Sequence, residues 1–503
     1  MARLYEYQGK ALLAEHGLEV PEGGVVSSPA EAARLAARLG GAVVLKAQAW
    51  ITGRAAKGGV KFASSPEEAQ RAAADLIRLR FGNFPVTEVL LERAVVIAHE
   101  LFVSVIIDDQ ARAPVLLLDA RGGSDIEERA GSIRRIPIDP RRGIDGDRVR
   151  QVIGDSPIDR AVHQKIARAV ETVIEMAALY ELTSIEVNPL VVTAGGGVVA
   201  VDCRMTVDDY AVFRHPALGI EIARELDHPA TELERIAYRL EQADHRGTFY
   251  FARLTTAAAP DSRGLIGFHG AGGGGSMMSM DAVARVGFTP ANFCDTSGNP
   301  SAAKVYRAAR VILAQGGLVG YFGSGSGVAS QEQHHSAYGL AKAFCELSLA
   351  IPAVIRLGGN GEDRAVEILE DACRGLPGRV EGYRKDDTPA FIADRFAELV
   401  QGADGATWTP RARSVPAYVG RSYRFPIKGG MVWIDHERCD RPTTAFVIEH
   451  ASALLRAEDG LPVLGVSDAE VAAKDSELLA LEVDCRRADR PVVFVDLAIP
   501  GLD

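Results

Sequence analysis

The chain has 503 residues, of which 47% are hydrophobic and 24% are charged, and 67 acidic against 56 basic residues give a net charge of −11. This composition is typical of a soluble globular protein with about three or four domains, and no run approaches the roughly 18 to 20 apolar residues that span a bilayer. We therefore expect no membrane segment, and the lack of a long basic block argues against nucleic acid as a partner.

The N-terminus and the cysteines indicate the compartment. Residues 1–17, MARLYEYQGKALLAEHG, predict an amphipathic helix with acidic residues and without the apolar core of a signal peptide. The six cysteines are scattered and form no CxxC pair, which is typical of reduced thiols and argues against a disulfide framework or a zinc knuckle. These features predict a cytoplasmic protein.

A basic, glycine-rich loop follows the first strands. Residues 20–49 read as a strand, an Ala-rich helix that starts at Ser-Ser-Pro, and a second strand in which Lys46 lies near the end. The loop at residues 50–62, WITGRAAKGGVKF, then carries Gly53 and Arg54. Backbone N–H groups and point charges in such a loop can hold a polyphosphate, although a solvated turn has the same composition.

Two glutamates flank the next turn. Residues 87–120 contain three strand-like runs, and Glu92 and Glu100 lie on either side of the turn Arg93–His99. A carboxylate at a strand end beside an apolar run could bind ribose hydroxyls while neighbouring backbone groups contact the base. Two solvated glutamates are the alternative.

A hairpin at residues 183–205 carries three oxygen-bearing side chains. Its predicted strands, IEVNPLVV and VVAVDCRM, are joined by a Gly-rich turn and contain Glu186, Asn188 and Asp202 near their ends. Two oxygen ligands that face each other across a hairpin suit Mg²⁺, which keeps waters and phosphate oxygens as its other ligands. An ordinary hairpin whose Asn precedes a Pro for turn reasons is the alternative.

The order of these parts matches a known family. LYEYQGKALLAEHGL, VVLKAQ, GR..KGGVK, the two glutamates with seven residues between them, IEVNPLVV, VDCRM and AVFRHP occur in this order. In this order, residues 1–240 resemble the ATP-grasp half of the β subunit of succinyl-CoA synthetase. The resemblance implies that Asn188 and Asp202 hold Mg²⁺ and that the catalytic residues Lys46 and Arg54 stabilise the transferred phosphoryl group. The ATP-binding residues that it implies are Lys46, Gly53, Arg54, Glu92, Val95 and Glu100. The family's G-R-G-K is GRAAK here, so Lys57 lies one position late.

After a predicted connector at residues 241–262, residues 263–401 alternate strands and helices. This alternation predicts a parallel sheet covered on both faces, with ligands beyond the carboxyl ends of its strands. Two Gly-rich runs, GAGGGGS and GSGSG, lie there, and each precedes a helix whose N-terminal N–H groups can take a phosphate or carboxylate. Tight strand-to-helix turns are the alternative.

This second region also resembles the same β subunit. HGAGGGGSMMSMD, PANFCDTSG and AVIRLGGNGED match the order of its flavodoxin-like ligase domain. The resemblance implies that His269, Gly270, Gly325 and Gly327 lie near the acyl substrate and near a phosphohistidine from the α subunit. His269 stands where the family has Asn and is a further catalytic candidate, which we expect to titrate near neutral pH. The family's FGGIVRCD loop is expanded to FGSGSGVASQEQHH, so succinate is not the expected substrate.

The remainder comprises a Pro/Gly-rich linker at residues 402–430 and a small extra α/β domain at residues 431–503. An I-D-x-x-x-C segment there is faintly similar to ferredoxin-like sequences, but the further cysteines that an iron–sulfur cluster needs are absent.

The overall prediction is an α/β protein that acts as the nucleotide-binding β chain of an ADP-forming carboxylate–CoA ligase. The resemblance implies Mg²⁺, ATP and CoA as cofactors and phosphate transfer from ATP to a small carboxylate through a phosphohistidine on a partner α chain. No segment resembles the CoA-binding domain of that chain, so we expect a hetero-oligomer in which the partner binds CoA. Two alternatives stay open: a ligase or transferase that uses an acyl phosphate without CoA, and a non-catalytic regulatory homologue.

Overall fold

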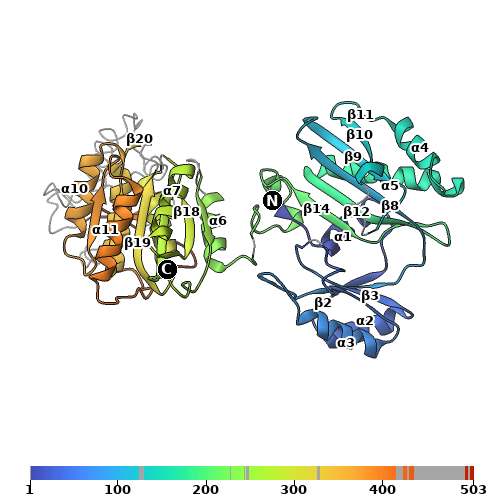
Figure 1. Ribbon diagram of the computed structural model, residues 1–503, viewed down its shortest axis with the longest axis horizontal. Coiled ribbons are helices and arrows are strands. Elements are labelled where there is room, and N and C mark those ends of the chain that lie inside the picture. The colour runs from blue at the N-terminus through green and yellow to red at the C-terminus, as the bar shows by residue number, and fades with distance from the viewer. Residues whose placement is uncertain are drawn as a thin grey trace. The chain divides into compact units, whose positions relative to one another are not determined.

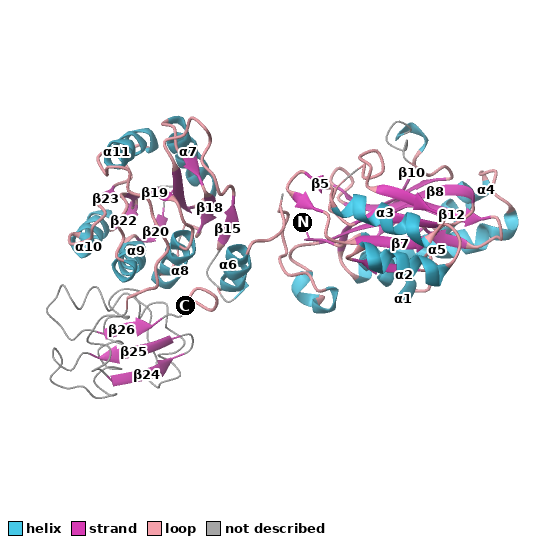
Figure 2. Cartoon of the chain, turned by 90° about the horizontal axis from the view of Figure 1, so that it is seen from below, coloured by secondary structure: helices cyan, strands magenta, loops and turns pink. Residues whose placement is uncertain are grey.

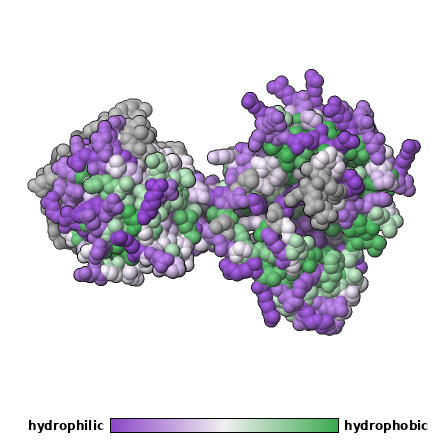
Figure 3. Space-filling view, in the orientation of Figure 1, coloured by the Kyte–Doolittle hydropathy of each residue, from purple (hydrophilic) through white to green (hydrophobic). Residues whose placement is uncertain are grey.

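The computed structural model describes residues 2–51, 53–123, 130–226, 228–242, 244, 248–298, 300–325, 329–414, 423–427, 430–434, 493–496 and 499–503. The chain divides into two compact units, Met1–Ala230 and Thr231–Asp503. Hydrophilic residues cover much of the visible outer surface of each unit (Figure 3). Among the described helices, none is both long and apolar enough to cross a membrane.

The first unit contains a small antiparallel sheet with two helices on one face (Figure 1). Its strand order is β2 (Gly23–Val26), β7 (Val89–Arg93), β3 (Val43–Ala47) and β4 (Val60–Ala63). The covering helices are α2 (Pro29–Leu39) and α3 (Pro66–Ile77). Both helices start at Ser-Pro, because the serine side chain accepts a hydrogen bond from the third helical N–H and proline is tolerated at the first position.

The larger sheet of the first unit is antiparallel throughout. Its order is β1 (Ala2–Arg3), β14 (Cys203–Val207), β12 (Leu182–Thr193), β8 (Ile97–Asp108), β9 (Ala113–Asp119), β10 (Arg134–Asp139) and β11 (Gly143–Ile144), and β13 (Val198–Ala200) also pairs with β12. Helices α4 (Gly146–Gly154) and α5 (Arg160–Leu179) pack on it, and Val170, Val173 and Met176 of α5 are fully buried.

The remaining elements of this unit are short apart from α1 (Glu6–Glu15), which lies between the two sheets in Figure 1. They are β5 (Arg80–Phe81) paired with β6 (Phe84–Pro85), and the 3₁₀ turns η1 (Ala130–Ser132), η2 (Val212–Arg214) and η3 (Pro216–Leu218).

The second unit is a mostly parallel sheet with helices on both faces, as the alternating pattern predicts. The strand order is β15 (Tyr250–Arg253), β18 (Asn292–Asp295), β16 (Leu265–Ala271), β19 (Leu318–Gly325), β21 (Ala353–Arg356) and β23 (Val380–Tyr383), and β17 (Thr289–Pro290) pairs with β16. Helices α7 (Gly273–Arg285) and α11 (Pro389–Gln401) lie on one face (Figure 2). The other face carries α6 (Glu232–Gln242), α8 (Ala302–Leu313), α9 (His334–Leu347) and α10 (Glu362–Cys373).

Two short pieces of the second unit differ from the sequence-based expectation. The stretch interpreted as a connector contains β15, which pairs antiparallel with β18, and its Phe251 is buried with 1% exposure. A parallel pair also forms between β20 (Ala329–Glu332) and β22 (Gly359–Asn360).

The C-terminal region contributes a three-stranded antiparallel sheet of β24 (Tyr423–Ile427), β25 (Gly430–Ile434) and β26 (Val493–Asp496). Strand β24 thus falls inside the predicted linker. Residues 499–503 return to the core of the second unit, where Ile499 is fully buried. Most of residues 431–503, including the I-D-x-x-x-C segment after Ile434, lies outside the described residues, so the predicted α/β character of this region stays a prediction.

Candidate functional site

A buried network of charged side chains occupies the first unit beside α1. Lys46, near the end of β3, donates a hydrogen bond to Glu6 Oε1 at 2.8 Å, and its Nζ lies 3.1 Å from Glu92 Oε2. Arg54 donates to Glu6 Oε2 at 2.5 Å and to Asp202 Oδ2 at 3.1 Å. The structure therefore brings together four of the residues that the motifs single out: Lys46, Arg54, Glu92 and Asp202.

The network keeps Glu6 and Lys46 ionised despite their burial, whereas burial and the Glu6 carboxylate raise the pKa of Asp202 above its ordinary value. Burial favours the neutral acid of Glu6, but Lys46, Lys10 and Arg54 outweigh it and lower the pKa of Glu6 below its usual range. Burial likewise favours the neutral amine of Lys46, but Glu6, Glu92 and Asp202 raise its pKa above the ordinary value. Lys46 is thus a permanent, fixed cation at neutral pH.

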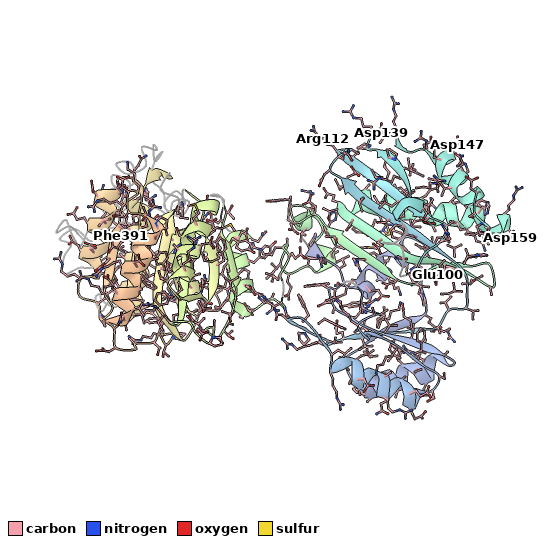
Figure 4. The ribbon with its side chains drawn as sticks, viewed as in Figure 1. Glu100, Arg112, Asp139, Asp147, Asp159 and Phe391 are labelled. Atoms are coloured by element: carbon pink, nitrogen blue, oxygen red, sulfur yellow. The ribbon has the colours of Figure 1, made fainter. Side chains whose placement is uncertain are left out.

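Glu92 and Glu100 belong to different sheets. Glu92 lies on β7 of the small sheet and is 2% exposed, and both of its carboxylate oxygens accept hydrogen bonds from Lys10 at 2.7 Å. Glu92 therefore contacts buried lysines, whereas its position in the sequence suggested that its carboxylate could bind ribose hydroxyls. Glu100 lies on β8 of the large sheet and is half-buried (Figure 4).

Asn188 and Asp202 lie opposite each other on adjacent strand segments. The backbone N–H of Asn188 donates to the carbonyl of Asp202 at 3.2 Å, and Val187 pairs with Cys203 in the ladder. The amide oxygen of Asn188 accepts from the Gly123 N–H at 3.0 Å. Gly123 has a φ of +106°, a backbone conformation that favours glycine.

This arrangement fits Mg²⁺ by its donor chemistry. One carboxylate and one amide oxygen are hard ligands, and a magnesium ion with only these protein ligands would keep waters and phosphate oxygens. Among the described residues, no group of three or more His, Cys, Asp or Glu side chains could enclose a metal completely. Two such donors would leave the remaining positions of the metal to water and phosphate oxygens, and Asn188 Nδ2 donates a hydrogen bond to Glu186 Oε1 at 3.5 Å.

The basic loop forms a compact turn beside the network. The Gly59 N–H donates to the Arg54 carbonyl at 2.9 Å, and Gly53 adopts a φ of +64°. Lys57 is exposed in this turn, and Val95, between β7 and β8, is half-buried. Among the described residues of this loop, Arg54 is the one that contacts the buried charges.

The second unit holds a pocket, open to solvent, beyond the carboxyl ends of its parallel strands. His269 and Gly325 of the predicted phosphate loops line this pocket. Gly270 follows His269 on β16. Gly270 approaches its neighbours closely, since a Cβ there would lie 2.4 Å from Ser276 Oγ. Gly327 lies outside the described residues. The polar lining is His269, Thr296, Ser324, Gln333, Ser336 and Arg356.

His269 does not titrate near neutral pH, contrary to the sequence-based expectation. The side chain is 6% exposed, and burial lowers its pKa to about 4, with only a small opposing effect from Asp295. Its Nδ1 lies 2.6 Å from the Tyr321 hydroxyl and its Nε2 lies 3.2 Å from the Thr296 hydroxyl. At neutral pH His269 is therefore a neutral, doubly hydrogen-bonded side chain of the pocket wall.

Sequence reasoning missed Arg356, which ends β21 in this pocket. Its Nη1 donates to the Gly325 carbonyl at 3.0 Å, while its buried Nε has no hydrogen-bond partner within the described part of the chain. The motif AVIRLGGN contains this arginine, so its place at the carboxyl end of a predicted strand was an available signal.

Glu6 and Lys10 were missed as well. They lie four residues apart on α1, and with Gly9 and Leu13 they form the buried stripe of that helix. Two opposite charges on the face that also carries leucine would have pointed to a buried ion pair.

The fold and the buried charges define an ATP-grasp protein, and residues 3–192 match the ATP-grasp domain family. The chain is 33% identical over 407 residues to the succinate–CoA ligase [ADP-forming] subunit beta of Rubrobacter xylanophilus, covering 79% of this chain and 98% of that protein. It is also 35% identical over 371 residues to the succinate–CoA ligase [GDP-forming] subunit beta of Thermus thermophilus, covering 73% and 93%. The chain belongs to the succinate–CoA ligase β-subunit family.

A solved structure has the same fold. ATP citrate lyase from Methanothrix soehngenii, in complex with citrate and coenzyme A, superposes with a TM-score of 0.64 at 18% sequence identity. The superposition covers 79% of this chain and 99% of that one, so the α/β architecture extends over most of the chain. The recognition of the family and of its ATP-grasp fold from motif order is confirmed.

Proposed function

We propose that this chain is the nucleotide-binding chain of an ADP-forming carboxylate–CoA ligase. The observation that carries the proposal is the buried network in which Lys46 and Arg54 lie beside Asp202, with Asn188 opposite Asp202. Fixed cations next to a hard-oxygen pair suit the charge of a transferred phosphoryl group.

In this proposal each residue has a separate role. Asn188 and Asp202 hold Mg²⁺, which neutralises charge on the phosphate oxygens when it is bound. Lys46 and Arg54 contact and orient the polyphosphate, and the turn that begins at Gly53 covers it. Val95 and Glu100 contact the nucleoside. Glu92 acts through Lys46, because its carboxylate contacts lysines in the network.

The pocket of the second unit is the proposed acyl or phosphate site. Among the described lining residues, Arg356 is the one cationic side chain, and a guanidinium is suited to a carboxylate or phosphate oxygen. Neutral His269 carries no charge, and both of its ring nitrogens already contact the Tyr321 and Thr296 hydroxyls, so its proposed role is to shape the pocket wall and not to transfer a proton at neutral pH.

We further propose that succinate is a poor substrate. His269 is larger than the Asn that it replaces, and the loop after β19 is longer than the family's loop and lacks its arginine. A dicarboxylate needs a second cationic partner, and the described lining provides one arginine. Steady-state kinetics on mono- and dicarboxylates test this point, and succinate as the best substrate by kcat/KM would show it to be wrong.

The proposal includes a second chain in the cytoplasm. The matched relatives are named as beta subunits, and we infer an α-type partner that carries the phosphohistidine and binds CoA. Purification of the native complex, followed by a screen of small acids with CoA and Mg·ATP, tests the proposal. We expect ADP release that requires both acid and CoA. Release without CoA would favour an acyl-phosphate ligase, and no release with any acid would favour the non-catalytic homologue.

A further inference from the structure

Helix α1 is held unusually close to the candidate nucleotide site. A Cβ on Gly9 would lie 2.8 Å from Cys203 Sγ, so the glycine lets the helix approach β14, the strand that follows Asp202. The same helical face carries Glu6, which is 6% exposed and points into the charged network. The N-terminal helix is therefore part of the wall of this site.

Glu6 contacts every cation of the network. Its Oε1 lies 2.9 Å from Lys10 Nζ and 2.8 Å from Lys46 Nζ, and its Oε2 accepts from Arg54 at 2.5 Å. Glu92 contacts the two lysines, and the ion pair of Asp202 is with Arg54. Within the described residues, Glu6 is thus the carboxylate shared by Lys46 and Arg54, the two cations assigned to the phosphoryl group.

Arg54 forms ion pairs with two carboxylates, those of Glu6 and Asp202. It lies closer to Glu6, at 2.5 Å, than to Asp202, at 3.1 Å. Without the charge on Glu6, Asp202 would be the remaining carboxylate partner of the guanidinium in these contacts. A divalent cation that needs Asp202 as a ligand would then compete with a more strongly held arginine.

We propose that Glu6 is a positioning residue that draws Arg54 away from Asp202, so that Asp202 can bind a divalent cation while Lys46 and Arg54 stay aligned for phosphate. The proposal rests on the proposed function of the first unit as a Mg·ATP site.

The test is the Mg²⁺ dependence of ATP binding by the full chain, measured by isothermal titration calorimetry at a series of Mg²⁺ concentrations. In Glu6→Gln the charge is lost at nearly constant volume, and we expect the half-saturating Mg²⁺ concentration to rise about tenfold, the equivalent of one charge-assisted contact. Glu6→Asp keeps the charge but has a shorter reach, so we expect a rise of about threefold. Glu15→Gln, the same change at an exposed position of the same helix, is the matched control and should leave the value unchanged.

The outcomes separate a positioning role from a structural one. A lower melting temperature with an unchanged Mg²⁺ dependence in both Glu6 variants would overturn the positioning role, because a structural role alone moves only stability. If Glu6→Gln does not fold, Glu6→Asp decides: a value equal to that of Glu15→Gln overturns the proposal. A wild-type chain that binds no ATP at any Mg²⁺ concentration would instead refute the proposed function itself, and with it this inference.

Discussion

Replacement of His269 by asparagine should remove a pH-dependent loss of stability from the second unit. The folded protein keeps His269 neutral because burial lowers its pKa from 6.5 to about 4. The unfolded chain binds a proton at that histidine as the pH falls below about 6.5, while the folded chain does not. The stabilisation is therefore fully present above the unfolded pKa and is lost as the pH falls toward the folded pKa.

The magnitude follows from the two pKa values. A shift of one unit corresponds to about 1.4 kcal/mol, so the full loss is about 3 kcal/mol, of which about 2 kcal/mol falls between about pH 7 and about pH 5. The asparagine side chain of the variant does not titrate. It could leave the fully buried Tyr321 hydroxyl without a partner, which costs about 1 to 3 kcal/mol at any pH. The wild type should be more stable than His269→Asn at neutral pH, and this advantage should shrink or reverse in acid.

Urea unfolding at several pH values measures the free energy of unfolding, and hydrogen exchange of peptides from β16 and β19 assigns the change to the second unit. His99→Asn, at a half-buried position on β8 of the first unit, is the control and should leave the pH dependence of the second unit as in the wild type. A difference between the wild type and His269→Asn that stays constant from about pH 7 to about pH 5 would refute the reasoning.

Four further predictions follow from the two sites. Asp202→Ala and Asn188→Ala should each abolish nucleotide-dependent phosphoryl transfer by the complex while the circular dichroism spectrum stays unchanged, and normal turnover of both variants at saturating Mg·ATP would contradict the metal assignment. The isolated chain should bind Mg·ATP in calorimetry but form no acyl-CoA, so acyl-CoA made by the rigorously purified single chain would disprove the need for a partner. Arg356→Lys should raise the KM for the carboxylate by about tenfold or more, because lysine cannot replace the planar guanidinium, and an unchanged KM would exclude this contact. Asp503→Asn should lower the free energy of unfolding of the second unit by about 1 to 3 kcal/mol, because buried Arg310 loses a carboxylate at 2.5 Å, and an unchanged urea midpoint would show that the tail contact is unimportant.

Local sequence patterns predicted many helices and strands of both units, and the family resemblance supplied the fold. Ser-Pro helix starts, period-two apolar runs and Gly-rich strand ends are short-range signals, and the elements that they predict occur in the structure. The order of the motifs then indicated the family. The edge strand β15 was missed because its four residues follow a helix and have only one fully buried aromatic, Phe251, to indicate a strand.

The candidate site was less predictable, because its contacts join distant parts of the chain. Glu6 and Lys46 are 40 residues apart, and Lys10 and Glu92 are 82 residues apart, so no local pattern contains either pair. The direction in which a side chain points could not be predicted either. Strand periodicity located Glu92 but could not show that it faces two buried lysines, nor could the sequence show the burial that keeps His269 neutral.

The contacts of Lys46 indicate which partner a bound phosphate would displace. Its Nζ donates hydrogen bonds to Glu6 Oε1 at 2.8 Å and to the Val201 carbonyl at 2.5 Å, and it forms an ion pair with Glu92 Oε2 at 3.1 Å. A phosphate oxygen would compete first with the partner that is held least firmly. Glu92 is the one that loses least, because its distance to Lys46 is the longest and both of its oxygens keep Lys10 at 2.7 Å. The loss of Glu6 would disturb a second cation, because its carboxylate also contacts Arg54. The two carboxylates thus differ in their contacts with the same lysine: Glu6 joins Lys46 to Arg54, whereas Glu92 joins Lys46 to Lys10.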